Sequence, residues 1–172
     1  MSRSLFAVVL AVALVAPAGA QIQFTDVSAA TGVGIPHIDV QFMMGAGGAF
    51  LDYDNDAWMD LLVTGGIGAP YLLRNQGGSF TDVTPTSGLV ANPFLQFTMS
   101  AACADHDNDG DTDVFLVNYG FDQLYRNDAG HFTAVGPAAG VVEAVPAWGS
   151  SAVFGDYDQD GFLDLYVGNY IK

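Results

Sequence analysis

Basic side chains are scarce in this sequence. Its 172 residues hold only four Lys and Arg against 19 Asp and Glu, which gives a formal net charge of −15 at neutral pH. Nucleic acids and anionic membrane surfaces are bound by clusters of positive charge, and the sequence contains no run of Lys or Arg. The composition therefore excludes both as binding partners.

Cysteine is almost absent as well. A single thiol, Cys103, cannot form a disulfide within the chain, so a disulfide-stapled fold is excluded. Its neighbours in the segment Ala101–Ala104 are small and apolar, which predicts a buried strand. Two interpretations of the thiol stay open: a small buried hydrophobe, or a partner for a cysteine outside this chain.

Long apolar runs are missing after the first 20 residues. Those residues contain Arg3, an apolar run from Leu5 to Ala16 and the small triplet Ala18-Gly19-Ala20. Charge, apolar run and small residues in this order are typical of a secretory signal peptide. We predict that residues 1–20 are removed and that residues 21–172 are secreted, periplasmic or at the cell surface. An uncleaved membrane anchor is the alternative.

An Asp-rich segment occurs three times. The copies begin their aspartates at Asp52, Asp105 and Asp156, so successive copies lie 53 and 51 residues apart. The three segments read GAFLDYDNDAWMDLLV (48–63), AACADHDNDGDTDVFL (101–116) and AVFGDYDQDGFLDLYV (152–167). A repeat of this length indicates an architecture built from stacked units.

A second motif repeats in phase with the first. It reads YLLRNQGGSFTDV at 71–83 and LYRNDAGHFTAV at 124–135, and its tail, FTDV, also occurs at 24–27. Short apolar runs bounded by Gly, Asn and Asp predict strands, and the Asn-x-x-Gly segments predict hairpin turns. No convincing helical periodicity follows residue 20.

These patterns predict an all-β fold for residues 21–172. Apolar residues make up 51% of the chain, enough to build a core, and units of about 50 residues with four short strands suit the blades of a β-propeller. We expect a partial propeller of roughly three four-stranded blades, incomplete at the C-terminal end. Because propellers close with about 4–8 blades, we interpret the chain as a fragment. An open sandwich, or an oligomer that completes the ring, is the alternative.

The aspartates fall at positions 1, 3, 5 and 9 of each Asp-rich loop. Carboxylates so close together repel one another unless a cation lies among them, and oxygen-only ligands favour Ca²⁺ before Mg²⁺. No set of His or Cys is in register with them, and we expect His106, at position 2, to point away from the metal. The twelve candidate ligands are Asp52, Asp54, Asp56, Asp60, Asp105, Asp107, Asp109, Asp113, Asp156, Asp158, Asp160 and Asp164. Backbone carbonyls at position 7 (Trp58, Asp111, Phe162) are expected to add to them.

Two other interpretations of the loops were weighed. An EF-hand requires a bidentate Glu at position 12 and a helix on each side. Position 12 here is Val63, Leu116 and Val167, inside apolar runs typical of strands, so the EF-hand is excluded. Solvated turns without a metal are the second interpretation, since Asp favours turns on its own.

The D-x-D-x-D-G-x-x-D loops between strands resemble the FG-GAP/VCBS repeats of integrin α-subunit propellers. The added Leu-Tyr-Arg-Asn…Gly-x-Phe-Thr motif is similar to that of the ASPIC/UnbV and cartilage-acidic-protein-like subgroup. The resemblance covers residues 22–172 and implies three Ca²⁺ sites formed by the twelve aspartates. The first loop departs from the pattern, because Ala57 stands where Gly is expected. If that position is left-handed, Ala costs roughly 1–2 kcal/mol, so we expect the Asp52–Asp60 site to be the weakest.

The sequence contains no recognisable catalytic motif: G-x-S-x-G, H-E-x-x-H and phosphate-binding glycine loops are all missing. We therefore expect no enzymatic activity from this chain. The favoured function is an exported propeller, stabilised by structural Ca²⁺, that binds or adheres to proteins or glycans. The alternative is a non-catalytic scaffold portion of a longer extracellular enzyme. The ligand itself cannot be inferred from these residues.

Overall fold

The computed structural model describes residues 24–33, 47–65, 70–90, 97–141 and 146–171. The predicted signal peptide lies outside these residues. Two short helices and ten strands follow one another along the chain: α1 (Ser28–Thr31), β1 (Gly48–Leu51), β2 (Asp60–Val63), β3 (Tyr71–Asn75), β4 (Phe80–Asp82), α2 (Thr84–Ser87), β5 (Phe97–Ala104), β6 (Asp113–Gly120), β7 (Gln123–Asp128), β8 (His131–Ala134), β9 (Ala147–Gly155) and β10 (Asp164–Ile171).

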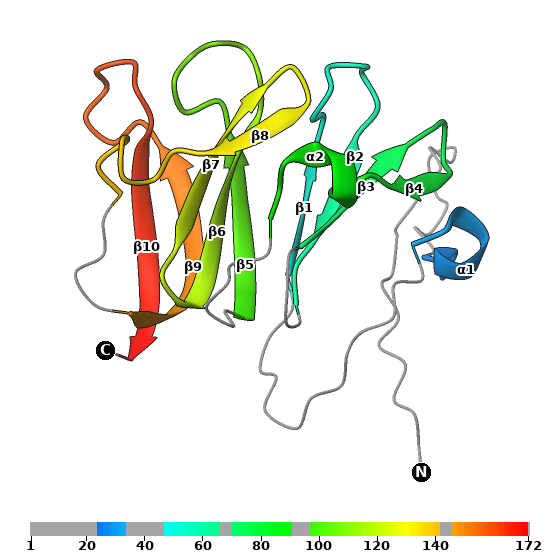
Figure 1. Cartoon of the computed structure of the whole chain (residues 1–172), viewed down its shortest axis with the longest axis horizontal. Coiled ribbons are helices and arrows are strands. Elements are labelled where there is room, and N and C mark those ends of the chain that lie inside the picture. Colours follow the sequence, from blue (N-terminus) through cyan, green and yellow to red (C-terminus); the bar gives the residue numbers. More distant parts are fainter. Residues whose placement is uncertain (1–23, 34–46, 66–69, 91–96, 142–145, 172) are drawn as a thin grey trace, which may run out of the picture.

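The strands form two antiparallel sheets that stand side by side (Figure 1). The first sheet has the order β1-β2-β3-β4 and contains the first repeat unit. The second has the order β10-β9-β6-β7-β8, with β5 also paired to β6. It holds the four strands of the second unit and two strands, β9 and β10, of the third. The all-β prediction is confirmed, and among the described residues the third unit contributes two strands rather than four.

Both hairpins predicted at the Arg-Asn motifs are present, and they use the same register. Arg74 lies opposite Thr81 on β3 and β4, and Arg126 lies opposite Thr133 on β7 and β8. At the turns, the side-chain oxygens of Asn75 and Asn127 accept a hydrogen bond from the amide three residues later, at 2.7 and 2.8 Å. The repeat in sequence is therefore a repeat in structure.

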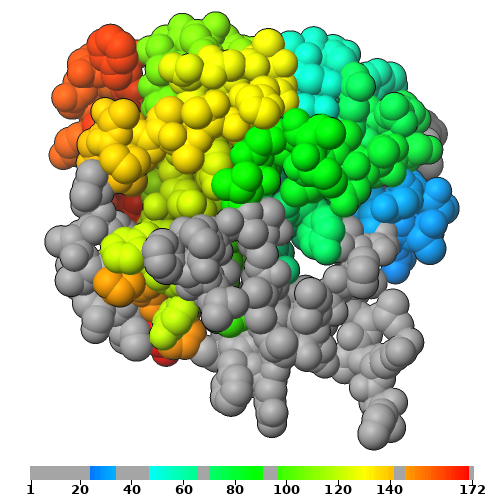
Figure 2. Space-filling view, in the orientation of Figure 1, coloured from blue at the N-terminus to red at the C-terminus, as the bar shows by residue number. Residues whose placement is uncertain are grey.

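Successive side chains of β6 point to opposite faces of the sheet and pack against different units, so this strand connects all three. Val114 and Leu116 pack into a cluster shared with the first unit, and Phe115 and Val117 pack into one shared with the third. The first cluster lies between the sheets and consists of Leu51, Tyr53, Leu62, Leu72, Leu89, Val114, Leu116, Tyr125 and Phe132. Each fully buried side chain of this size contributes roughly 1.5–3 kcal/mol, so stacking of units supplies the core that no unit has alone. In Figure 2 the units follow one another across the molecule in chain order.

The two helices are single turns in equivalent places of consecutive repeats. Asp26 and Asp82 each accept a hydrogen bond at 2.9 Å from the amide two residues later, at the start of α1 and α2. Each helix ends at a glycine of positive φ, Gly32 or Gly88. A Cβ on Gly88 would stand 2.2 Å from the Phe132 carbonyl oxygen, so no other residue fits there. Four-residue helices have no periodicity to detect, which is why the sequence did not predict them.

The FTDV tail at residues 24–27 thus opens the same kind of helix as the complete motif ending at Val83. This confirms its assignment to the repeat. Among the described residues, no helix is both long and apolar enough to cross a membrane.

Cys103 lies half-buried on β5, opposite Val114, and packs against the cluster between the sheets. Burial raises the pKa of its thiol to about 12. We expect the native thiol to react with a charged disulfide reagent at pH 8 on the order of a thousandfold more slowly than in the unfolded chain, because the thiolate is the nucleophile. Timed labelling with and without guanidinium measures this ratio, and equally fast labelling of the native protein would contradict the burial of the thiol.

Candidate metal centres

The three Asp-rich loops connect β1 to β2, β5 to β6, and β9 to β10, and they lie along one edge of the molecule (Figure 1). Each loop follows the first strand of its unit and leads into the second. Stacking of the units therefore brings chemically equivalent loops next to one another.

One hydrogen-bond framework shapes all three loops. The position-1 aspartate accepts hydrogen bonds from the amides at positions 5 and 6, and the position-5 aspartate accepts one from the amide at position 7. The position-1 bonds measure 3.1 and 2.9 Å to Asp52, 3.0 and 2.9 Å to Asp105, and 3.1 and 3.1 Å to Asp156. The position-5 bonds to Asp56, Asp109 and Asp160 are each 2.9 Å. The hydrogen bonds accepted by these aspartates thus define the conformation of each loop.

The framework requires left-handed backbone at two positions. Position 6 has φ of 69° at Ala57, 96° at Gly110 and 90° at Gly161. This confirms the conformation that the glycine pattern predicted, and Ala57 is the residue strained by it. Position 4 is left-handed too, at Asn55, Asn108 and Gln159. Sequence reasoning missed position 4, although Asn in two of the three loops was the available signal.

The position-4 side chains also link neighbouring loops. The side-chain amide of Asn55 donates to Asp111 of the second loop at 2.5 Å, and that of Asn108 donates to the Gly161 carbonyl of the third at 3.3 Å. The other carboxylate oxygen of Asp111 accepts from the Ala129 amide at 2.7 Å. The loops therefore form a connected row rather than three separate turns.

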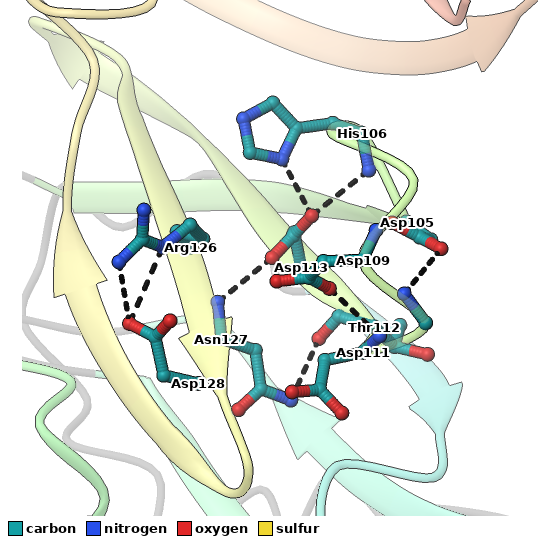
Figure 3. Close-up of polar contacts among 10 residues, drawn as sticks. Asp105, His106, Asp109, Asp111, Thr112, Asp113, Arg126, Asn127 and Asp128 are labelled. Carbon is teal, nitrogen blue, oxygen red and sulfur yellow. Dashed lines mark hydrogen bonds and ion pairs between the residues drawn. The ribbon is translucent and has the colours of Figure 1, made fainter.

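The position-9 aspartates anchor the loops to the hairpins that follow. Asp60 accepts from the amides of Tyr53 (3.1 Å) and Asn75 (2.7 Å), and its side chain is fully buried. Asp113, also fully buried, accepts from the amides of His106 (2.8 Å) and Asn127 (2.7 Å), as Figure 3 shows. Asn75 and Asn127 therefore belong to the site, although their sequence pattern predicted only turns. The repeated Arg-Asn pair was the available signal for this second role.

Most of the predicted ligands come together in compact groups. In each group, one ligand atom per residue lies within 4.8 Å of the others. The carboxylate groups are Asp52, Asp54 and Asp60; Asp105, Asp107 and Asp109; and Asp156, Asp158 and Asp164. Asp113 is grouped with Asp107 and His106, whereas Asp56 and Asp160 belong to none of these groups.

The expectation that His106 points away from the carboxylates is wrong. Its Nδ1 lies 2.5 Å from an oxygen of Asp113 (Figure 3). The His106 amide already bonds to the same oxygen, so the ring folds back over the carboxylate that holds its own backbone. One histidine does not make a zinc-type ligand set, and the oxygen-rich character of the loop is unchanged.

Arg74, on β3, lies among the carboxylates of the first loop. Nη2 of Arg74 is 2.8 Å from Asp54 and 3.0 Å from Asp56. The Trp58 amide, together with Arg74, lowers the pKa of Asp56. The second oxygen of Asp54, Oδ1, is buried and has no hydrogen-bond partner. An unpaired buried carboxylate oxygen fits a cation ligand, because burial without a partner is costly.

The equivalent arginine of the second unit pairs with a carboxylate outside its loop. Arg126 donates from Nε (3.2 Å) and Nη2 (2.8 Å) to Asp128 (Figure 3). The first unit has Gln76 at the position of Asp128, so nothing there competes for Arg74. Both arginines pair with carboxylates, but only Arg74 pairs with those of an Asp-rich loop.

Among the described residues, no arginine is ion-paired with a carboxylate of the second loop, and negative charges there lie close together. Burial, and then the charges of Asp109 and Asp113, raise the pKa of Asp107. Clustered carboxylate oxygens at the mouth of a loop are the donor set of a hard divalent cation. The residues present therefore fit the ion that the sequence pattern suggested.

Ala57 and Gly110 offer a reciprocal test of backbone strain. We expect Ala57→Gly to raise the free energy of unfolding by about 1 kcal/mol, and Gly110→Ala to lower it by a similar amount. A Cβ on Gly110 would meet no atom within 4 Å, so its effect reports conformation alone. Urea unfolding of both variants, with chelator present, measures the two values. Loss of stability in Ala57→Gly would rule out strain at that position.

Removal of Arg74 tests whether its guanidinium competes with a cation for Asp54 and Asp56. We expect Arg74→Gln to lower the melting temperature in chelator, because two neighbouring carboxylates lose their counter-charge, and to enlarge the rise produced by Ca²⁺. Arg126→Gln is the matched control and should change both values less, because Arg126 pairs with Asp128 and not with a carboxylate of the loop. Equal responses of the two variants in thermal melts would contradict the competition.

Comparison with known families agrees with this geometry. A model of the FG-GAP-like repeat matches twice, at residues 52–116 and 105–167. Each match starts at the first aspartate of a loop and extends into the second strand of the next unit, so together they span most of the described strands. No curated protein matches the chain. The ASPIC/UnbV subgroup stays a prediction. The chain belongs to the FG-GAP-like repeat family.

Proposed function

We propose that this chain is an exported calcium-binding repeat module whose ions are structural, and that the assembled repeats bind or adhere to protein or glycan ligands. One observation carries the proposal. Three loops on one edge fold on the same hydrogen-bond framework and present grouped carboxylates, including the buried, unpartnered oxygen of Asp54.

Calcium is the favoured ion because of the donors and their spacing. Ca²⁺ accepts six to eight oxygen ligands in flexible arrangements, whereas Mg²⁺ demands a near-octahedral set and keeps its waters. FG-GAP repeats often bind Ca²⁺. Positions 1, 3 and 9 of the first and third loops, and positions 1, 3 and 5 of the second, are the best-placed ligands. The position-7 carbonyls would each add one oxygen, and water would complete the shells.

A structural role for the ions follows from where the loops are fixed. The first two loops are each tied to their own unit by the position-9 aspartate and to the next loop by an asparagine. An ion bound there cancels repulsion among the carboxylates and stabilises a geometry that already exists. At tenfold over its dissociation constant, each ion would stabilise the fold by about 1.4 kcal/mol.

The binding role extends the family assignment. Repeats that use their acidic loops for stability leave their other surfaces to ligands, and a propeller-like fold supports binding and catalysis alike. We favour binding because the acidic loops contain oxygen donors for an ion but no activated nucleophile with a base beside it.

Thermal melts followed by far-UV circular dichroism test the metal assignment. We expect the melting temperature of the chain in saturating Ca²⁺ to exceed that in chelator by about 10 °C, since three sites each add about 1.4 kcal/mol. Mg²⁺ should give a smaller rise. If the protein is folded and Ca²⁺ does not change its melting temperature, the metal assignment is wrong and the aspartates are solvated turn residues.

Matched position-3 variants assign the effect to individual loops. Asp54→Asn, Asp107→Asn and Asp158→Asn change the same ligand in the three loops without changing its size. Asp54→Asn should remove the smallest part of the calcium-induced rise, because strain at Ala57 and the charge of Arg74 weaken that site. If Asp54→Asn removes as much of the calcium-induced rise as either of the other variants, or more, the first site is not the weakest.

A further inference from the structure

The second Asp-rich loop differs from the other two at position 2, where it has a histidine instead of a tyrosine. Tyr53 of the first loop is buried in the cluster between the sheets, and Tyr157 of the third is 91% exposed. A phenol keeps its proton at neutral pH and is a poor ligand, whereas neutral imidazole is the commonest metal ligand in proteins. Of the three loops, the second alone therefore offers a nitrogen donor at this position.

The ring of His106 lies against the aspartate that anchors its loop. Its Nδ1 is 2.5 Å from Oδ2 of Asp113 (Figure 3), and the two side chains are 16% and 0% exposed. Oδ2 also accepts from the His106 amide at 2.8 Å, and Oδ1 accepts from the Asn127 amide at 2.7 Å. These contacts fix the carboxylate and hold the imidazole beside it.

The position-9 aspartate belongs to a different group of possible ligands in this loop. Asp60 and Asp164 lie together with the aspartates at positions 1 and 3 of their loops. Asp113 lies together with His106 and Asp107, and one ligand atom of each is within 4.8 Å of the others. The histidine thus replaces the position-1 aspartate in the group, so three carboxylates become two carboxylates and an imidazole.

A nitrogen donor changes which ion the group favours. Ca²⁺ and Mg²⁺ take oxygen ligands, whereas imidazole suits first-row transition-metal ions, whose affinity for mixed nitrogen and oxygen sites rises from Mn²⁺ to Ni²⁺. Two carboxylates and one neutral imidazole balance the charge of a dication, and three protein donors leave positions for water on a six-coordinate ion. A structural zinc site has four protein ligands, which this group does not provide.

A hydrogen bond to Asp113 is the simpler role for the ring, but burial of the carboxylate does not require it. Asp60 is equally buried, and its oxygens accept from the amides of Tyr53 and Asn75 without any imidazole. The amides of His106 and Asn127 supply the same two bonds to Asp113. The ring is therefore an addition to a carboxylate that is already satisfied, and a ligand role accounts for its position.

From these observations we propose that the second loop binds a six-coordinate first-row transition-metal dication through Nδ1 of His106 and the carboxylates of Asp107 and Asp113. The inference rests on the proposed function only in treating the loop as a cation site, and it assigns a different class of ion to that site. Asp107 also belongs to the all-carboxylate group with Asp105 and Asp109. The loop therefore binds Ca²⁺ through that group when the transition-metal ion is absent.

Titration of the full chain with Co²⁺ in calcium-free buffer tests this assignment. By isothermal titration calorimetry, we expect one site to bind Co²⁺ roughly tenfold or more tightly than any other, because one loop alone has a nitrogen donor. Since Co²⁺ is paramagnetic, proton NMR of the same complex should show hyperfine-shifted imidazole signals from the ligating ring. Absence of these signals at saturating Co²⁺ would overturn the proposal, and this result requires no variant.

A histidine variant and a matched control assign the site to His106. His106→Tyr gives the second loop the position-2 residue of the other two loops, and it should weaken the tight Co²⁺ site about tenfold or more and remove the shifted signals. Its Ca²⁺ affinity should change by less than about threefold, because Ca²⁺ prefers oxygen ligands. His131→Gln removes an exposed histidine on β8 and should leave the Co²⁺ site intact. Circular dichroism checks that each variant is folded, and His106→Gln replaces His106→Tyr if the tyrosine variant is not.

Unchanged Co²⁺ affinity in the His106 variant, or equal loss in both variants, would contradict the proposal. The calcium melts separate this failure from that of the proposed function. If Ca²⁺ raises the melting temperature but no Co²⁺ site depends on His106, the transition-metal assignment alone is wrong. If the His106-dependent Co²⁺ site is present and Ca²⁺ has no effect, the assignment holds and the calcium function is wrong.

Discussion

The hydrogen bonds between each position-9 aspartate and two backbone amides are the constraint on which the first two units depend. One amide belongs to the loop itself, and the other belongs to the asparagine at or next to the end of the third strand of the unit. Charge-assisted bonds of this kind are stronger than neutral ones, and they are needed because Asp60 and Asp113 are fully buried. They bind an acidic loop to an apolar hairpin and so connect the candidate metal centres to the core.

Other features follow from this anchor. With position 9 fixed, the position-1 carboxylate can fold the loop onto itself, and position 3 is brought to the same opening. With the hairpin fixed, its apolar residues pack against the next unit, and Asn127 donates from its side chain to the Tyr53 carbonyl of the preceding unit at 2.8 Å. A single repeated contact therefore relates loop geometry to the stacking of units.

The units share this framework but differ in charge. The first loop has a strained alanine and an arginine paired with its carboxylates, and the second has glycine and an arginine that pairs with Asp128 outside the loop. The third has glycine and no such arginine contact among the described residues. Three copies of one motif can thus differ in affinity for an ion while keeping the same backbone, because the differences lie in side chains around the loop.

The sequence by itself determined the repeat, the all-β class, the hairpin turns and the left-handed backbone at position 6. Each of these depends on short-range chemistry: turn residues, alternation and the sterics of glycine are local properties of the chain. The grouping of most of the aspartates could also be predicted, because they recur at the same spacing in three short loops. The single-turn helices could not, since four residues carry no periodic signal.

Only the tertiary structure decided which groups meet across the chain. It placed Arg74 on Asp54 and Asp56, turned His106 onto Asp113, and joined Asn55 to Asp111 of the next loop. These contacts depend on strand register and on how units stack, which bring together residues up to 74 positions apart. Local sequence fixes the shape of each loop, but its neighbours in space fix its charge environment, and that environment governs what the loop can bind.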